Sequence, residues 1–157
     1  MRTVVRFVSP ATNKPQLGAV EYIVMLRLPN VTLIALTGKD FSAHEVALHK
    51  SCEEIEWGAT KIIFDAKIKD INSWNKAIIY ELHNYVQTDF AFLFHADGYP
   101  INAGQWRQEF LDYDYIGAPW WHHKGQVGNG GFSFRTSKLH KIISDKKFDK
   151  FHPEDSM

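Results

Sequence analysis

The sequence predicts an α/β protein with a mainly parallel central sheet that is flanked by helices. Three observations support this fold class: apolar runs typical of buried strands, segments of helical period between them, and connections of only a few residues. Parallel strands need a crossover connection, and a helix between each pair of strands supplies one. The order strand, helix, strand, helix, strand therefore indicates a parallel sheet covered by helices.

The first predicted unit is a strand followed by a helix. Residues 31–37 form an apolar, partly β-branched run that Gly38 closes, which is typical of a strand buried on both faces. Ser42 can cap the next segment, with Glu45 three residues later. Apolar residues then recur at near-helical spacing, so we expect a helix of about four turns that ends at Gly58.

A second unit and a third strand follow. Residues 59–64 predict a strand with Asp65 at its carboxyl end, and Ser73 is a plausible cap for a helix whose apolar side extends to Val86. Residues 89–94 predict the third strand. In such sheets ligands bind beyond the carboxyl ends of the strands. The polar residues at those ends are Thr37, Asp40, Asp65, His95 and Asp97.

The first thirty residues fit this pattern less well. Residues 4–8 and 20–28 predict two strands, with a turn region at residues 10–15. We expect them to form a peripheral hairpin within a single domain that spans residues 1–157.

Composition and charge exclude several classes of protein. A chain of 157 residues with 45% hydrophobic residues is expected to form one domain with its own core. Eighteen Lys and Arg against eighteen Asp and Glu provide no charged surface for nucleic acid or an anionic membrane. No apolar run reaches the roughly 20 residues of a transmembrane helix. Cys52 can form no internal disulfide, and a secretory signal is lacking, so we expect a cytoplasmic protein.

The first segment with chemical potential is His95-Ala-Asp-Gly98, directly after the third predicted strand. An aspartate in this position can bind a divalent cation, and one carboxylate suffices when substrate phosphates supply other ligands. The alternative is that Asp97 and Gly98 only form a tight turn.

The second segment, residues 110–121, alternates aromatic and acidic residues ahead of a glycine and a proline. Asp112 and Asp114 also suit a solvated loop. Trp120 and Trp121 are adjacent, so an extended chain cannot direct both indoles into one core. We therefore expect one of them to be exposed or to face a cleft.

The third segment, residues 127–135, holds three glycines within four residues. Glycine lets backbone amides approach a ligand that side chains would otherwise block. Asn129, Gly130 and Gly131 therefore predict an anion or sugar cradle, with a bulge or turn as the alternative. The segment lacks the Gly-Lys-Ser/Thr ending of a P-loop.

Taken in order, these three segments resemble glycosyltransferases of GT-A type found in bacteria and large viruses. The resemblance runs from about residue 31 to the end, and the runs Phe-Leu-Asp-Tyr-Asp-Tyr-Ile-Gly-Ala-Pro-Trp (110–120) and Val-Gly-Asn-Gly-Gly-Phe-Ser (127–133) carry it. It implies a GT-A-like nucleotide-diphospho-sugar transferase fold. It also implies metal-assisted transfer of a sugar from a nucleotide-diphosphate donor to a glycan or other hydroxyl acceptor.

The resemblance also implies roles for particular residues. Asp97 stands where GT-A enzymes have the last aspartate of their Asp-x-Asp metal motif, with His95 at the first acidic position, so the two would hold Mn²⁺ or Mg²⁺. Glu154 and Asp155 match a Glu-Asp pair, one member of which would take the proton from the acceptor hydroxyl. The chain ends soon afterwards, where similar proteins continue, so we expect a fragment or a shortened member. The remaining expected binding residues are Thr37 and Asp65 for the nucleotide, and Trp120, Trp121, Asn129, Gly130 and Gly131 for donor sugar and acceptor.

Two other functions fit the same residues. The first is a non-catalytic carbohydrate-binding module derived from the same fold. The second is a metal-dependent phosphohydrolase that uses Asp97 and His95. By contrast, His122 and His123 are expected to be loop residues, and Cys52 to be part of the core.

Overall fold

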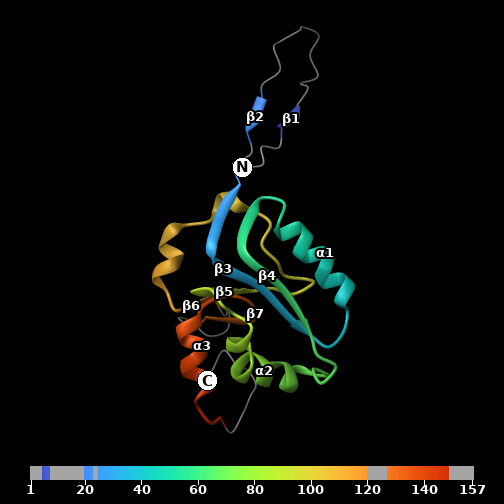
Figure 1. Ribbon diagram of the computed structural model, residues 1–157, viewed down its shortest axis with the longest axis vertical. Coiled ribbons are helices and arrows are strands. Elements are labelled where there is room, and N and C mark those ends of the chain that lie inside the picture. The colour runs from blue at the N-terminus through green and yellow to red at the C-terminus, as the bar shows by residue number, and fades with distance from the viewer. Residues whose placement is uncertain (1–4, 8–19, 23–24, 120–126, 149–157) are drawn as a thin grey trace.

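A five-stranded mixed sheet forms the centre of the protein (Figure 1). The computed structural model describes residues 5–7, 20–22, 25–119 and 127–148. The strand order is β4-β3-β5-β7-β6, and the strands span β3 (Leu26–Thr37), β4 (Ile55–Phe64), β5 (Phe90–Leu93), β6 (Tyr115–Pro119) and β7 (Val127–Thr136).

The prediction of an α/β protein with helices beside a central sheet is confirmed, but the prediction of a mainly parallel sheet is wrong. Strand β3 runs parallel to both β4 and β5, whereas β7 runs antiparallel to both β5 and β6. The reason lies in the connections. The described residues between β5 and β7 form two 3₁₀ helices (Ala103–Gln105 and Gln108–Asp112) and β6, with no α-helix that would return the chain to a parallel start.

Within the described residues, three α-helices flank this sheet: α1 (Phe41–Ser51), α2 (Ile71–Tyr80) and α3 (Ser137–Ser144). A short 3₁₀ helix, Leu82–Asn84, follows α2, and α3 packs beside α2. None of the helices in the described ranges is both long enough and apolar enough to cross a membrane.

The core consists of two clusters, because side chains alternate between the two faces of β3. Leu33 and Ala35 pack with Ala47 of α1 on one face. Ile34 packs with Ile78 of α2 on the other face. Both faces of β3 are therefore buried, as its continuous apolar run predicts.

Helix α1 is shorter than the spacing predicts, and its start differs as well. It begins after Asp40, which has a positive φ of 53° and makes no side-chain cap, so Ser42 is not the capping residue. It ends at Ser51, because Ile55 starts strand β4 and buries its side chain there. Gly58 lies inside β4, where a Cβ atom would overlap the carbonyl oxygen of Pro29, and does not end the helix.

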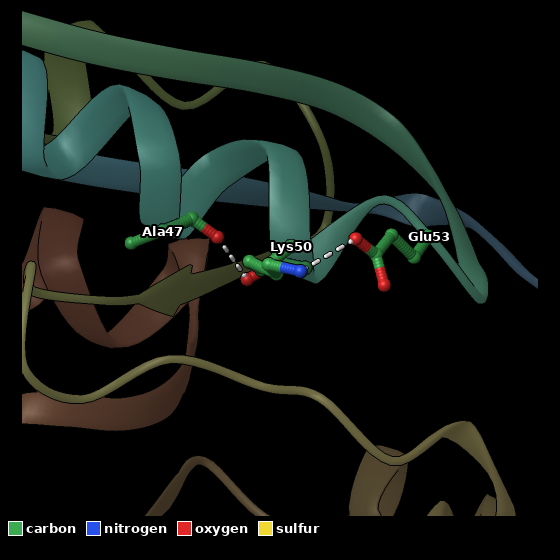
Figure 2. Close-up of polar contacts among 4 residues, drawn as sticks. Ala47, Lys50 and Glu53 are labelled. Atoms are coloured by element: carbon green, nitrogen blue, oxygen red, sulfur yellow. Dashed lines mark hydrogen bonds and ion pairs between the residues drawn. The ribbon is translucent and has the colours of Figure 1, made fainter.

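Local contacts hold the end of α1 (Figure 2). Ser51 Oγ donates a hydrogen bond to the carbonyl oxygen of Ala47 at 2.9 Å, and Lys50 forms an exposed ion pair with Glu53 at 3.1 Å. The Ser51 carbonyl oxygen accepts a hydrogen bond from Trp57 Nε1 at 3.1 Å, which ties the helix to β4.

Helix α2 begins with a capping box, although Ser73 is not its N-cap. Asp70 caps the helix: its Oδ1 accepts a hydrogen bond from the Ser73 amide at 2.8 Å, and the Asp70 amide donates to Ser73 Oγ at 3.0 Å. The α-helix ends at Tyr80, so Val86 lies beyond it, but Val86 still packs in the second core cluster.

The amino-terminal strands form a separate antiparallel pair, β1 (Val5–Phe7) with β2 (Val20–Tyr22). Figure 1 shows this pair set apart from the five-stranded sheet. The predicted strand 20–28 is not continuous, since Leu26 and Leu28 belong to β3 and pair with β4.

Candidate functional site

The carboxyl ends of β3 and β4 place two of the predicted binding residues side by side. Thr37 ends β3, and the amide of Asp65 donates a hydrogen bond to its carbonyl oxygen at 3.0 Å. The side chains bind local backbone: Thr37 Oγ1 accepts from the Lys39 amide at 3.1 Å, and Asp65 Oδ1 accepts from the Lys67 amide at 2.8 Å. Gly38 is required here, because a Cβ atom would overlap the carbonyl oxygen of Ile68.

The His95–Gly98 segment is a tight turn at the carboxyl end of β5. The His95 amide donates to the Gly98 carbonyl oxygen at 2.8 Å, and the Gly98 amide donates back at 3.2 Å. Asp97 lies at the tip of this turn and is exposed. Among the described residues its carboxylate has no hydrogen bond or ion pair. The turn therefore accounts for Gly98 and leaves the carboxylate open to a ligand.

The His95 ring lies between residues of the first turns of α1 and α2. It meets the Trp74 ring edge-on at 5.1 Å between centroids, and the His44 ring at 5.9 Å. Both neighbours are anchored to backbone oxygens: Trp74 Nε1 donates to Leu36 at 3.0 Å, and His44 Nδ1 donates to Asp40 at 2.9 Å. The ring of His95 is therefore held in a defined position.

Two imidazole nitrogens in this region are buried and have no hydrogen-bond partner within the described part of the chain: Nε2 of His44 and Nε2 of His95. Burial and the neighbouring His44 lower the pKa of His95, while Asp97 acts in the opposite direction. At pH 7 the uncharged imidazole, with a free lone pair on one ring nitrogen, is therefore favoured at His95.

The glycine segment packs directly on this turn. A Cβ atom on Gly131 would lie 3.1 Å from Cδ2 and Nε2 of His95, and a Cβ atom on Gly98 would lie 3.8 Å from Cβ of Phe132. The structure therefore brings together the two segments that carry the predicted metal and donor-sugar residues. Because Gly131 meets the His95 ring, a side chain at that position would press on it.

Sequence reasoning missed the residues that hold the glycine segment. Arg135 Nη2 donates to the Gly130 carbonyl oxygen at 3.0 Å, and Arg135 Nε donates to Ser133 Oγ at 2.8 Å. Ser133 Oγ donates to the same carbonyl oxygen at 2.9 Å. Arg135 is buried and its guanidinium lies 5.0 Å from the centroid of the Tyr115 ring. The available signal was an arginine within a strand of Phe and Ser residues. His44 and Trp74 were also missed, because helical spacing alone does not single them out.

The glycine segment lies within strand β7, and the pairing of β7 with β6 shifts register beside it. Gly117 of β6 pairs with Ser133, but the next residue, Ala118, pairs with Gly128. Residues 129–132 therefore have no partner on β6 in this register, and they include Gly130 and Gly131. Asn129 belongs to β7, but its side chain lies outside the described part of the structure.

Several residues with a predicted role are not covered by the described ranges. These are Trp120 and Trp121 for the acceptor, the predicted bases Glu154 and Asp155, and the predicted loop residues His122 and His123. The described residues contain no group of three or more His, Cys, Asp or Glu side chains that could hold a metal ion. Asp97 and His95, the predicted metal residues, lie in the same turn.

One protein family matches this chain. Residues 60–156, more than half of the chain, match the model of the family described as "Protein of unknown function (DUF5672)". The matched range includes the His95–Gly98 turn and the glycine segment. Neither the curated proteins nor the solved structures contain a match.

Proposed function

The chain belongs to the DUF5672 family, whose description assigns no activity, and from its candidate site we propose that it is a glycosyltransferase of GT-A type. It would transfer a sugar from a nucleotide-diphosphate donor to a glycan or other hydroxyl acceptor. The reaction would be a displacement at the anomeric carbon, with the acceptor hydroxyl as nucleophile.

One observation carries this proposal: the turn with the exposed Asp97 and the segment with Gly131 are in contact beyond the carboxyl end of β5. Thr37 ends β3, which runs parallel to β5, and Asp65 follows β4, which runs parallel to β3, so both residues lie at the same end of the sheet. This end is where α/β sheets bind nucleotides, because loop amides and helix amino termini meet there. A diphosphate bound there would come close to the carboxylate of Asp97, which has no partner among the described residues, and to the glycine backbone at Gly130 and Gly131.

The residues present fit a divalent cation with few protein ligands. Asp97 offers an exposed carboxylate, and the neutral ring favoured at His95 suits a borderline ion such as Mn²⁺. When bound, such a cation stabilises the charge that develops on the departing diphosphate. Glu154 or Asp155, by resemblance, would accept the proton of the acceptor hydroxyl.

The Arg135 and Ser133 hydrogen bonds support the proposal in another way. They fix the carbonyl oxygen of Gly130 from inside the protein, so that the backbone of the glycine segment keeps one orientation. A preformed cradle loses less entropy when a ligand binds. His44, whose Nδ1 is anchored to Asp40, would limit the orientations of the His95 ring.

Calorimetric titration with UDP-, GDP- and dTDP-linked sugars, with and without Mn²⁺, tests the proposal. We expect one class of donor to bind more tightly with Mn²⁺. The variant Asp97→Asn should lose this metal-dependent gain, by about tenfold or more in affinity. The control Asp112→Asn removes an equally exposed carboxylate outside the site and should bind like the parent chain.

Two further measurements separate the transferase from its alternatives. The variants Glu154→Gln and Asp155→Asn should retain donor binding, and one of them should lose sugar transfer. Retention of glycans by Asp97→Asn, with no donor binding by the parent chain, would favour the carbohydrate-binding module. Release of phosphate from simple esters would favour the phosphohydrolase. A folded chain that binds none of the donors contradicts the transferase.

A further inference from the structure

A cavity of about 620 Å³ lies on the sheet face that α1 covers, beneath residues 99–110. Its volume falls in the range of sites for small organic ligands. The lining is mainly apolar, and its aromatic residues include Trp57, Phe92, Tyr99, Trp106, Phe110 and Phe134. Neither the family match nor the proposed transferase chemistry assigns a ligand to it.

The aromatic rings that line the cavity are rigidly packed. Trp106 meets Phe110 edge-on at 5.4 Å between centroids and Phe134 at 5.6 Å, and Trp57 meets Phe92 at 5.7 Å. Such rings provide apolar area with little conformational freedom to lose on binding. The cavity is therefore suited to an apolar ligand body.

Two indoles of this lining differ in their hydrogen bonding. Trp57 Nε1 donates to the Ser51 carbonyl oxygen at 3.1 Å, so its donor is satisfied. Trp106 Nε1 is buried and has no acceptor among the residues that the structure describes. Buried donors are normally paired, and an unpaired one is a place where a ligand oxygen can bind. A ligand that reached Trp106 Nε1 would therefore satisfy this donor with an acceptor atom.

Charge adds a second requirement for that ligand. Arg107, next to Trp106 in sequence, also lines the cavity and is exposed. It makes no ion pair with any residue in the described ranges, and no other charged residue contributes to the described lining. A guanidinium and an indole N–H in the lining of one cavity match a ligand with a carboxylate, which accepts several hydrogen bonds at once.

We propose that this cavity binds a small monocarboxylate, with its apolar body against the aromatic rings and its carboxylate on Trp106 Nε1 and Arg107. The proposal does not rest on the transferase function, because neither the donor nor a cation takes part in it, although Ser133 belongs both to the cavity lining and to the hydrogen bonds that hold the glycine segment. Fatty acids and aromatic carboxylates both combine an apolar body with one carboxylate. The probes described below distinguish these two classes of ligand.

Isothermal titration calorimetry with decanoate, 2-naphthoate and 1-decanol tests the assignment. Decanol keeps the chain and lacks the charge. We expect decanoate or 2-naphthoate to bind about tenfold more tightly than decanol, because a hydrogen bond to a charged group is the stronger kind. Tighter binding of decanoate indicates an aliphatic ligand, and tighter binding of 2-naphthoate indicates an aromatic one.

Matched variants test the two polar contacts. Trp106→Phe and Trp57→Phe shorten equivalent rings in the same lining, but only the first removes the unpaired donor. We expect Trp106→Phe to weaken binding of the acid by about tenfold and Trp57→Phe to change it by less than about threefold. Arg107→Gln should remove the preference for the acid over decanol.

The cavity itself is tested by Ile116→Trp, which places a larger side chain on a lining position of β6. This variant, if folded by circular dichroism, should lose binding of all three probes. The proposal is overturned if the folded parent chain binds neither acid. It is also overturned if decanol binds as well as the acids, or if Trp106→Phe and Trp57→Phe weaken binding equally.

Discussion

His140 should make the stability of the folded chain depend on pH. This residue of α3 has a side chain that is 1% exposed, and neither ring nitrogen has a hydrogen-bond partner within the described residues. Burial lowers the pKa of His140 to about 3, with smaller contributions in the same direction from Arg135 and His83. In the unfolded chain the same imidazole titrates near its ordinary pKa of about 6.5.

The sign follows from where the proton binds. Between pH 6.5 and pH 3 the unfolded chain binds a proton at His140 that the folded chain does not, so the free energy of unfolding falls as the pH falls. The slope is about 1.4 kcal/mol per pH unit in this window. From pH 7 to pH 5 the loss from this one group is therefore about 2 kcal/mol. Above pH 7 it contributes almost nothing.

Urea denaturation of the parent chain and of His140→Leu at pH 7, 6 and 5 measures this effect. Leucine is apolar, so the exchange removes no hydrogen bond that the described structure contains. The difference in unfolding free energy between the two chains should shift by about 2 kcal/mol in favour of His140→Leu between pH 7 and pH 5. His49→Leu, at an exposed position of α1, is the control and should show no comparable shift.

One result would refute the reasoning: parent chain and His140→Leu with the same dependence on pH, within about 0.5 kcal/mol. In that case His140 would bind its proton in the folded chain as readily as in the unfolded chain. The burial seen in the structure would then not exclude the charged form.

Two other predictions concern the site and the first helix. Gly131→Ala should lower the free energy of unfolding, measured in urea, by about 1–3 kcal/mol, because the His95 ring is held by His44 and Trp74 and cannot move away from the new Cβ atom. In the control Gly98→Ala the new Cβ atom would lie 3.8 Å from its nearest neighbour, so the loss of unfolding free energy should be clearly smaller. Equal losses in the two variants would contradict the packing of Gly131 on His95. Burial raises the pKa of the Cys52 thiol, so iodoacetamide at pH 7.5 should label Cys52 more slowly in the folded chain than in urea, and equal rates would contradict its burial.

The strands that sequence reasoning found are those that local pattern defines. The runs at 31–37, 59–64 and 89–94 lie within or overlap β3, β4 and β5. The inner strands β3 and β5 are largely apolar because both of their faces are covered, whereas the edge strand β4 is partly exposed. The end of α1 was misplaced for a different reason. Ile55 continues the apolar spacing of the helix, but its burial in β4 decides its conformation, and spacing cannot distinguish the two.

The direction of β7 depends on contacts far apart in sequence. Phe92 pairs with Phe134 and Leu93 with Ser133, and nothing in either segment alone specifies an antiparallel arrangement. The same holds for the site. Sequence reasoning identified Asp97 and Gly131 from separate segments, but the packing of Gly131 on His95 and the Arg135 bonds to the glycine segment arise from the tertiary structure.

By itself, the sequence determined which segments are buried strands and which residues have the chemistry for a ligand, because both follow from side-chain type and local period. Only the tertiary structure decided the mixed direction of the sheet, the enclosure of His95 between His44 and Trp74, and the aromatic cavity beside Trp106. These features depend on the pairing and packing of distant segments, whose energies no local pattern contains.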